Sequence, residues 1–199
     1  MPTKLMLIRH GSTDWNIKKR YCGWADLGLS QAGRRQVKKL CLRLSKEKFH
    51  KIYSSDRKRA QQTARIAFAG AQFEIVPDLR EIHFGVFEGL THRQILKKYA
   101  KVYRQWLKDP YSVTIPKGEA LADFKKRVTV ALKKIIRENK NKTIAVVCHG
   151  GAISIYINSI LKSKKFWEQI PKSASISLVE CADNRAKVKL FNDVRHLNE

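Results

Sequence analysis

The sequence predicts an α/β fold: a three-layer α/β/α sandwich with a mainly parallel sheet and one antiparallel edge strand. Three observations favour it. Short apolar runs alternate with longer segments of helical periodicity along the chain. Two of the apolar runs end in His-Gly, at residues 10–11 and 149–150, as expected of strands that feed loops at one edge of a sheet. The last two apolar runs are close together, which favours an antiparallel pair.

The first strand is expected over residues 4–10, where a short apolar run ends at polar residues and a glycine. A long polar and aromatic loop separates it from a helix whose N-cap is Ser30, because apolar side chains at helical spacing follow that serine. Residues 51–55 have the character of a second strand. A helix is expected over 57–70, with Gly70 placed to end it.

A third, short strand is expected over 74–77, where Pro77 stops it, and the glycines that follow indicate a loop. The next helix is expected over 92–107, because apolar and aromatic residues fall on one of its faces. Residues 109–119 contain two prolines and one glycine, which is typical of a surface connection. We therefore expect a helical insertion at about 91–118 that caps the site.

A helix is expected over 119–138. Its buried stripe should be Leu121, Phe124, Val128, Leu132 and Ile135. Residues 143–151 contain the clearest strand, an apolar run ended by a glycine pair, and a helix over 152–161 follows. Residues 175–181 and 186–191 have strand character and should pair antiparallel at a sheet edge.

Length, charge and cysteine content bound the class of protein. A chain of 199 residues favours one core, so we expect a single domain over 1–199. With 41 Lys+Arg against 17 Asp+Glu, the net charge of +24 suits nucleic acid, an anionic membrane or a phosphorylated small substrate. Four scattered cysteines without a CxxC pair, and the absence of a signal-peptide or membrane-spanning pattern, favour a reduced cytoplasmic protein.

Chemically active side chains gather where the predicted strands end. His10 and His149 should emerge at the same edge of a parallel sheet. A third strand leads to a basic cluster that contains Arg57 and Arg59, and the loop after residue 77 brings Glu81. Two imidazoles, several guanidiniums and a carboxylate suit phosphoryl transfer through a covalent intermediate. If cationic, His149 would stabilise the oxygens of the transferred group.

Each residue type has a defined role in that chemistry. A neutral imidazole attacks phosphorus when a hydrogen bond fixes one ring nitrogen and the other faces the substrate, and His10 is the candidate. The guanidiniums of Arg9 and Arg59 match the phosphoryl oxygens, and Gly150, at a helix N-terminus, could add a backbone N–H. Glu81 can protonate the leaving alkoxide and then accept a proton from the hydrolytic water.

Four blocks in this order, RHGSTDWN, SSDRKRAQQTA, LREIHFGVFEG and VVCHGG, resemble the histidine phosphatase superfamily, which has the phosphoglycerate-mutase-like fold. The resemblance covers nearly the whole chain. It implies His10 as the phosphorylated nucleophile, Arg9, Arg59 and His149 as the phosphate pocket, and Glu81 as the proton donor. The short chain and the EIHFGVFEG block resemble the phosphatase branch, including α-ribazole phosphatases, more than the mutase branch.

The same resemblance implies contacts around the phosphate. Asn16 matches a residue that touches it, Thr13 is placed with Asn16, and the backbone around Cys22 and Gly23 is expected to meet the substrate. Arg57 stands where the family usually has an apolar residue, but Arg59 is preferred because RAQQTA aligns as a block. Neither a metal nor a cofactor is expected, since arginines in the pocket would repel a cation.

The remaining histidines and other notable residues have ordinary interpretations. Four histidines without a matching motif are expected at the surface or in loops: His50, His83, His92 and His196. Of these, His83 is close enough to Glu81 to line the rim of the site. Trp15 and Trp24 are expected to shape the loop by packing, and Cys148 to be an inert buried thiol.

The leading hypothesis is a metal-independent phosphomonoester hydrolase that acts on a small phosphorylated metabolite through phospho-His10. One alternative is a cofactor-dependent phosphoglycerate mutase. Another is a non-catalytic module that binds phosphoryl groups or nucleic acid. We expect no specific nucleic-acid partner, because only the charge supports one, and no membrane partner. The identity of the ester and the oligomeric state, monomer or homodimer, stay open.

Overall fold

The computed structural model describes residues 1–163, 166–182 and 185–198. Its strands are β1 (Thr3–Arg9), β2 (Lys51–Ser54), β3 (Glu74–Ile75), β4 (Thr143–Cys148), β5 (Ile176–Ala182) and β6 (Arg185–Asp193). Its α-helices are α1 (Asp14–Ile17), α2 (Gln31–Leu44), α3 (Lys58–Ala67), α4 (His92–Lys108), α5 (Leu121–Glu138), α6 (Gly150–Leu161) and α7 (Arg195–Asn198). Short 3₁₀ turns cover Pro77–Leu79, Gly85–Phe87 and Phe166–Gln169.

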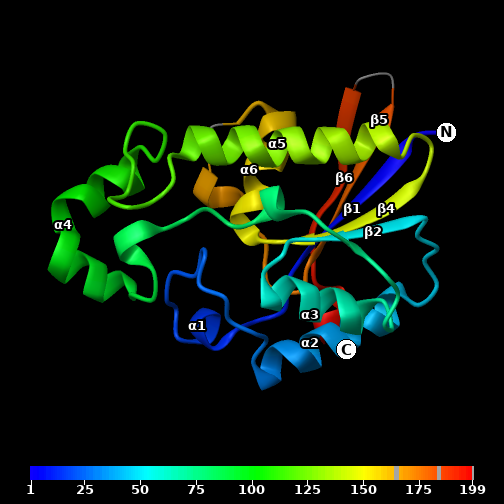
Figure 1. The fold of residues 1–199 in the computed structure, drawn as a ribbon, viewed down its shortest axis with the longest axis horizontal. Coiled ribbons are helices and arrows are strands. Elements are labelled where there is room, and N and C mark those ends of the chain that lie inside the picture. Colours follow the sequence, from blue (N-terminus) through cyan, green and yellow to red (C-terminus); the bar gives the residue numbers. More distant parts are fainter. Residues whose placement is uncertain (164–165, 183–184, 199) are drawn as a thin grey trace.

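The strands form one sheet in the order β3-β2-β4-β1-β5-β6 (Figure 1). Its first four strands are parallel, since β4 pairs in parallel with both β1 and β2, and β2 with β3. The predicted mainly parallel sheet is confirmed, and so is the antiparallel pairing of the last two strands. The reversed strand is β5, one place inside the edge, because β6 turns back again and runs in the direction of β1.

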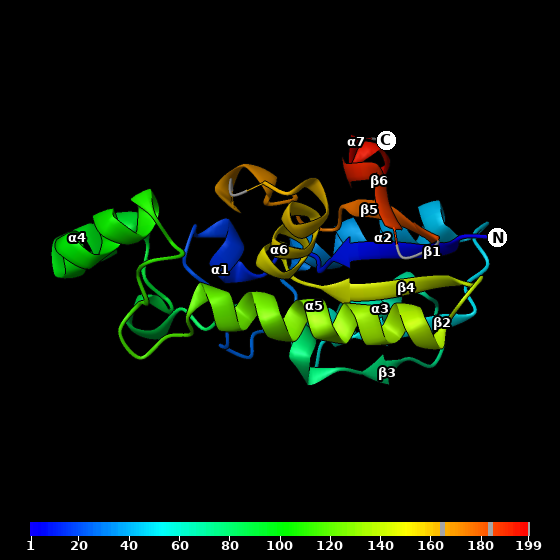
Figure 2. The ribbon, with the colours of Figure 1, turned by 90° about the horizontal axis from the view of Figure 1, so that it is seen from above.

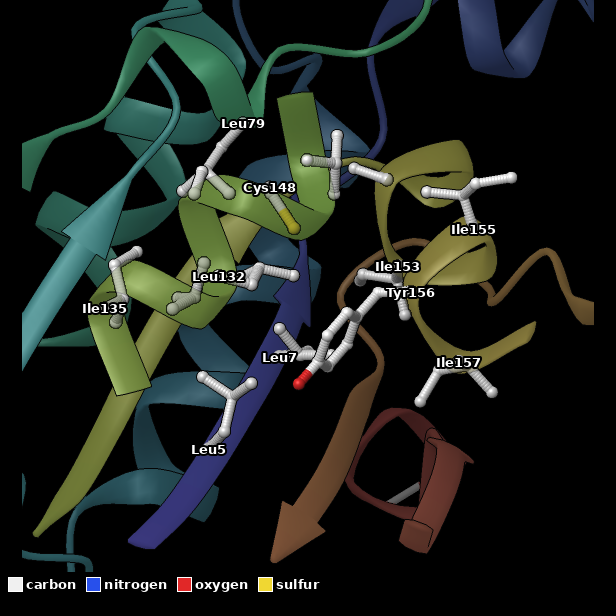
Figure 3. Packing of buried hydrophobic residues seen from close by; sticks show 14 of the residues in the cluster. Leu5, Leu7, Leu79, Leu132, Ile135, Cys148, Ile153, Ile155, Tyr156 and Ile157 are labelled. Carbon is white, nitrogen blue, oxygen red and sulfur yellow. The ribbon is translucent and has the colours of Figure 1, made fainter. Parts of the chain in front are cut away.

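Helices cover both faces of the sheet, as a three-layer fold requires. Alternate residues of β1 point to opposite faces. Leu5 and Leu7 join the cluster formed with α5 and α6, whereas Met6 and Ile8 pack with α2 and α3 on the other face. Figure 3 shows the first cluster, with Leu132 of α5 directed toward β1.

The helices begin and bury residues largely as their sequences predict. Ser30 is the N-cap of α2, where its side chain accepts a hydrogen bond from the backbone N–H of Gly33. The predicted apolar stripe of α5 is buried throughout. Helix α3 ends at Ala67, earlier than expected, and Gly70 follows in a turn with φ +82°.

Two short helices lie where the sequence analysis expected none. Thr13 and Asn16 form a capping box around the four-residue helix α1, inside the long polar loop. The other is α7, which packs on α2 and buries His196. His196 is 5% exposed and its Nε2 lies 3.0 Å from the carbonyl oxygen of Ala174, so the surface assignment was wrong. Helices of four residues are too short to show a periodicity.

The segment after residue 91 stands beyond the carboxyl ends of β1 and β4. Figures 1 and 2 show α4 at the end of the molecule away from the N-terminus, with α1 between it and the sheet. A separate aromatic cluster holds it there, with Phe87, Tyr103 and Trp106 almost fully buried. That this insertion caps a site stays a prediction. None of the helices in the described segments is long and apolar enough to cross a membrane.

Candidate active site

The ends of β1 and β4 bring the two histidines together. These strands pair in parallel with Arg9 opposite Cys148, so the next residues, His10 and His149, leave the sheet side by side. Their ring centroids are 5.1 Å apart, with an angle of 63° between the ring planes. Both side chains are buried, His10 with 3% and His149 with 0% of its surface exposed. The predicted convergence at the carboxyl edge is therefore present.

His10 is held in the state that a nucleophile needs. Its Nδ1 lies 2.7 Å from the carbonyl oxygen of Gly11, so Nδ1 carries the proton and donates to that oxygen. The lone pair of Nε2 instead accepts a hydrogen bond of 3.2 Å from Nε of Arg59. Burial lowers the pKa of His10 well below its usual 6.5, and the positive charges of Arg59 and Arg9 lower it further. The ring is thus neutral, with Nε2 unprotonated.

Arg59 covers the reactive nitrogen of His10 from the start of α3. Its side chain is fully buried, and its three nitrogens all have acceptors. Nη1 donates to the carbonyl oxygen of Ala25 at 2.7 Å, and Nη2 to that of Gly23 at 2.6 Å. These bonds fix the guanidinium against the loop that follows α1. A bound phosphoryl group must therefore displace part of this network to reach Nε2.

Two buried polar atoms beside His10 have no hydrogen-bond partner within the described segments. They are Nε of Arg9 and Nδ1 of His149, whose Nε2 lies 2.9 Å from Oγ of Ser55. Buried polar groups are rarely left unpaired. Gly150, the first residue of α6, lies so close to Arg9 that a Cβ on it would stand 3.2 Å from Nε. A guanidinium and a helix N-terminus thus meet at one point, which suits an oxyanion.

His149 is neutral in this environment. Burial lowers its pKa well below 6.5, and the positive charges of Arg59, Arg9 and Arg127 act in the same direction. The cationic form considered from the sequence is thus disfavoured in the ligand-free protein. A bound phosphate dianion would oppose these effects, because it brings negative charge next to the ring.

Glu81 is a buried carboxyl group at the N-terminus of α6. It is 7% exposed, its Oε2 accepts a hydrogen bond of 2.8 Å from the N–H of Gly151, and its Oε1 accepts one of 3.0 Å from the N–H of Ile82. Burial raises its pKa above the usual 4.5, although these N–H groups and the charges of Arg9 and Arg59 oppose the rise. Such a group can hold a proton for a leaving oxygen.

The other expected substrate contacts lie in the loop between β1 and α2. Oδ1 of Asn16 accepts bonds of 3.0 Å from both the N–H and the hydroxyl of Thr13, which leaves the amide nitrogen of Asn16 outside these bonds. Thr13 is fully buried and uses its hydroxyl within the cap. The N–H of Gly23 donates to Glu88 at 3.1 Å, and Cys22 is partly buried. Their contacts with a phosphate stay predictions.

Arg57 does not share the position of Arg59. Its Nη1 donates to the carbonyl oxygen of Trp24 at 3.0 Å, and its guanidinium lies 5.5 Å from the centre of that indole. Arg80 lies 5.0 Å from the same ring. The indole Nε1 donates to the carbonyl oxygen of Glu81 at 3.0 Å. Trp24 therefore packs between two arginines and shapes the loop, as expected.

Sequence reasoning missed Glu88 and Ser55. The carboxylate of Glu88 accepts hydrogen bonds from the backbone N–H groups of Gly23, Trp24 and Phe84 at 3.1, 2.8 and 3.2 Å, so it ties two loops of the site together. Glu88 lies inside the quoted LREIHFGVFEG block, which was the available signal. Ser55 follows β2, and only the fold shows that it reaches His149.

Among the residues that the structure describes, no three His, Cys, Asp or Glu side chains gather as potential metal ligands. The expectation that the site works without a metal stays a prediction.

Comparisons with known proteins place the chain among phosphatases. Residues 5–194 match the model of the histidine phosphatase superfamily (branch 1). Phosphoserine phosphatase 1 of Hydrogenobacter thermophilus is 32% identical over 200 residues, covering 98% of this chain and 95% of the relative. The adenosylcobalamin/alpha-ribazole phosphatase of Escherichia coli is 32% identical over 193 residues, with 95% of both chains covered.

Solved structures agree with the fold. The structure of phosphoserine phosphatase from Entamoeba histolytica in complex with 3-phosphoglyceric acid has a TM-score of 0.89 and 27% sequence identity, covering 98% of this chain and 99% of that one. The family match and the whole-length relatives agree with the expectation from the four sequence blocks. The chain belongs to the histidine phosphatase superfamily.

Proposed function

We propose that this chain hydrolyses small phosphomonoesters through a phosphohistidine at His10, without a metal ion. One observation supports this above all. His10 is buried and neutral, its Nδ1 is fixed by the Gly11 carbonyl oxygen at 2.7 Å, and its unprotonated Nε2 faces the Arg59 guanidinium. An imidazole in that state attacks phosphorus without first losing a proton.

In the first step, Nε2 of His10 forms a bond to phosphorus as the ester P–O bond breaks. Arg59 and Arg9 hold the transferred oxygens, and the N-terminus of α6 at Gly150 adds positive potential. The leaving oxygen takes its bonding electrons and receives the proton of Glu81, so an alcohol departs and Glu81 becomes a carboxylate.

In the second step, water attacks the phosphohistidine. The Glu81 carboxylate takes a proton from the water as the new P–O bond forms and the P–N bond breaks. The N–P electron pair returns to Nε2, inorganic phosphate leaves, and His10 and Glu81 regain their starting protonation states. The two N–H groups that bind the carboxylate, from Ile82 and Gly151, stabilise it between the two steps.

The relatives suggest the class of substrate. They include a phosphoserine phosphatase and an adenosylcobalamin/alpha-ribazole phosphatase. We therefore propose a small phosphorylated metabolite in which the phosphate is esterified to a primary or secondary alcohol. A panel that contains phosphoserine, α-ribazole phosphate, 3-phosphoglycerate and nucleoside monophosphates would rank the candidates by kcat/KM.

Rapid quenching with radiolabelled phosphoserine, or the best ester of the panel, tests the mechanism. Wild-type protein should trap acid-labile, base-stable phosphate, and His10→Ala should trap none and lose turnover by about a thousandfold or more. The matched control is His50→Ala, which should behave as wild type. His50 is exposed and precedes β2, whereas Ser55, which lies beside His149, follows that strand.

Each alternative gives a different result in the same assays. Turnover that survives in His10→Ala would overturn the phosphohistidine. Loss of activity in a chelator, restored by Mg²⁺, would overturn the metal-independent mechanism. A mutase would isomerise phosphoglycerate and release little phosphate. A binding module would turn over none of the esters and would bind polynucleotides equally well with and without His10.

A further inference from the structure

A second hollow of the molecule lies far from His10, at the end of the sheet where β1 begins. It has a volume of about 990 Å³, which is at the upper end of the range for small-molecule sites in proteins. Thr3 at the start of β1 lines it. His10 lies seven residues further along an extended strand, so the two places are roughly 20 Å apart. The hollow is therefore separate from the site described above.

Four cationic side chains surround the hollow. Lys133 and Arg137 belong to α5, Lys140 follows the end of that helix, and Arg185 begins β6. The spacing of four residues places Lys133 and Arg137 on one face of α5. All four are exposed. Among the residues that the structure describes, no Asp or Glu lines this hollow, and none of the four cationic side chains forms an ion pair.

Glu180 is an acidic residue beside this arrangement. It lines a smaller hollow of about 650 Å³ that adjoins the first one at Arg185, and it forms an ion pair with Lys189 at 3.6 Å. Lys189 therefore partly neutralises the negative charge of Glu180. Four positive groups around one hollow repel one another, and a bound anion would remove that repulsion.

The floor of the hollow is apolar. Ile136, Tyr156 and Cys181 line it, together with small side chains at the ends of β5 and β6. Tyr156 belongs to the core cluster and is 4% exposed. Figure 3 shows its ring reaching from α6 toward Leu5 and Leu7 of β1, with the hydroxyl on that side. A ligand seated here would meet apolar surface below and positive charge at the rim.

We propose that this hollow is a second ligand site, for a small molecule that carries two or more anionic groups on an apolar or planar body. The class that matches is a nucleoside di- or triphosphate. Its base or ribose would lie on the floor near Ile136 and Tyr156, and its phosphates would face Lys133, Arg137 and Lys140. A single phosphate group would use only part of the cationic rim.

The probe is the β,γ-methylene analogue of ATP, titrated into the protein by isothermal titration calorimetry at fixed ionic strength. The triple variant K133E/R137E/K140E changes the rim. The matched control K125E/K126E/K134E changes the net charge equally, at exposed lysines of α5 outside the hollow. We expect binding at least tenfold weaker in the rim variant and within twofold of wild type in the control.

A second variant keeps all the charges. Ala186→Trp places a large ring at a half-buried position that lines the hollow, so it should also block the analogue. The kcat of all variants with the best ester should equal that of wild type, because none of these residues is near His10. Equal affinity of the analogue for wild type, rim variant and Ala186→Trp would overturn the second site, and so would absence of binding to wild type. Neither result depends on whether the ester is hydrolysed.

Discussion

At the scale of the residue, the site is built from ionisable groups whose burial changes their protonation. Burial favours the neutral forms of His10, His149 and Glu81. A neutral imidazole and a protonated carboxyl group are the forms that the proposed first step consumes. The same low-polarity surroundings strengthen the attraction between the guanidiniums and the charge on the transferred group. Burial therefore produces the protonation states that the proposed catalysis needs.

The pH dependence of turnover follows from these shifts. The pKa of Glu81 is raised above 4.5, so its proton is retained to higher pH than usual, and kcat should fall as pH rises through that raised value. The pKa of His10 is lowered below 6.5, so the neutral nucleophile should persist in mildly acidic solution. Glu81→Gln should lower kcat by about a hundredfold to ten-thousandfold and remove the alkaline limb.

Measuring kcat against pH for wild type and Glu81→Gln checks this. The control is the quench experiment on the same variant, in which phosphohistidine should still form, slowly, because His10 is unchanged. An alkaline limb of equal position in both proteins would show that another group supplies the proton.

At the scale of the element, two segments without regular pairing to the sheet are held in place by contacts with the loops of the site. The loop after α1 is fixed by Arg59 and by the Glu88 carboxylate. Helix α4 is joined to the loops around Glu81 by aromatic side chains: Trp106 lies 6.0 Å from the ring of Phe84 and 5.9 Å from that of Phe87. The indole of Trp167, in a further turn, lies 4.5 Å from Trp106. Aromatic packing therefore fixes where the insertion stands.

Removing the central ring of this cluster should loosen the insertion and lower stability together. Trp106 is 1% exposed, so Trp106→Ala should reduce the free energy of unfolding by about 3–5 kcal/mol, because it leaves a large cavity among Phe84, Phe87 and Tyr103. Urea unfolding measures the change. Leu107→Ala, the next residue, is 36% exposed and should cost less than about 1 kcal/mol. Equal losses would contradict the central place of Trp106.

At the scale of the whole molecule, the charge is the dominant property. A net charge of +24 on 199 residues produces a positive potential that extends beyond the site. Phosphate esters are anions, so this potential should raise their local concentration and their rate of encounter. The proposed ligand site at the amino end of the sheet is a local concentration of the same charge.

Added salt should therefore lower kcat/KM, which includes substrate binding, more than it lowers kcat. Raising KCl from about 20 to about 300 mM shortens the screening length several-fold, so we expect kcat/KM for a phosphate ester to fall about tenfold. The kcat at saturating substrate should change little, because the groups that react are buried and poorly screened. Steady-state kinetics over the salt series separate the two constants. A kcat/KM that is independent of salt would contradict steering by the net charge.

The sequence by itself determined the succession of the strands and the longer helices along the chain, and the meeting of His10 with His149. Both are local or nearly local properties: apolar periodicity marks the elements, and parallel strands that end in His-Gly must deliver their histidines to one edge. The four sequence blocks also identified the family. The stripe of α5 was predictable for the same reason, since helical spacing alone decides which of its residues face the core.

Only the tertiary structure shows which side chains of the site contact one another. The RAQQTA block already favoured Arg59, but only the structure shows what Arg57 and Arg59 bind, because their partners lie about thirty to fifty positions away along the chain. Only the structure shows which nitrogen of His10 carries the proton, since that depends on how closely the carbonyl oxygen of Gly11 approaches Nδ1. The hydrogen bonds by which Glu88 joins two loops, and the burial of His196, arise from packing between distant segments. No period in the sequence records such contacts, because they depend on three-dimensional distance rather than on spacing along the chain.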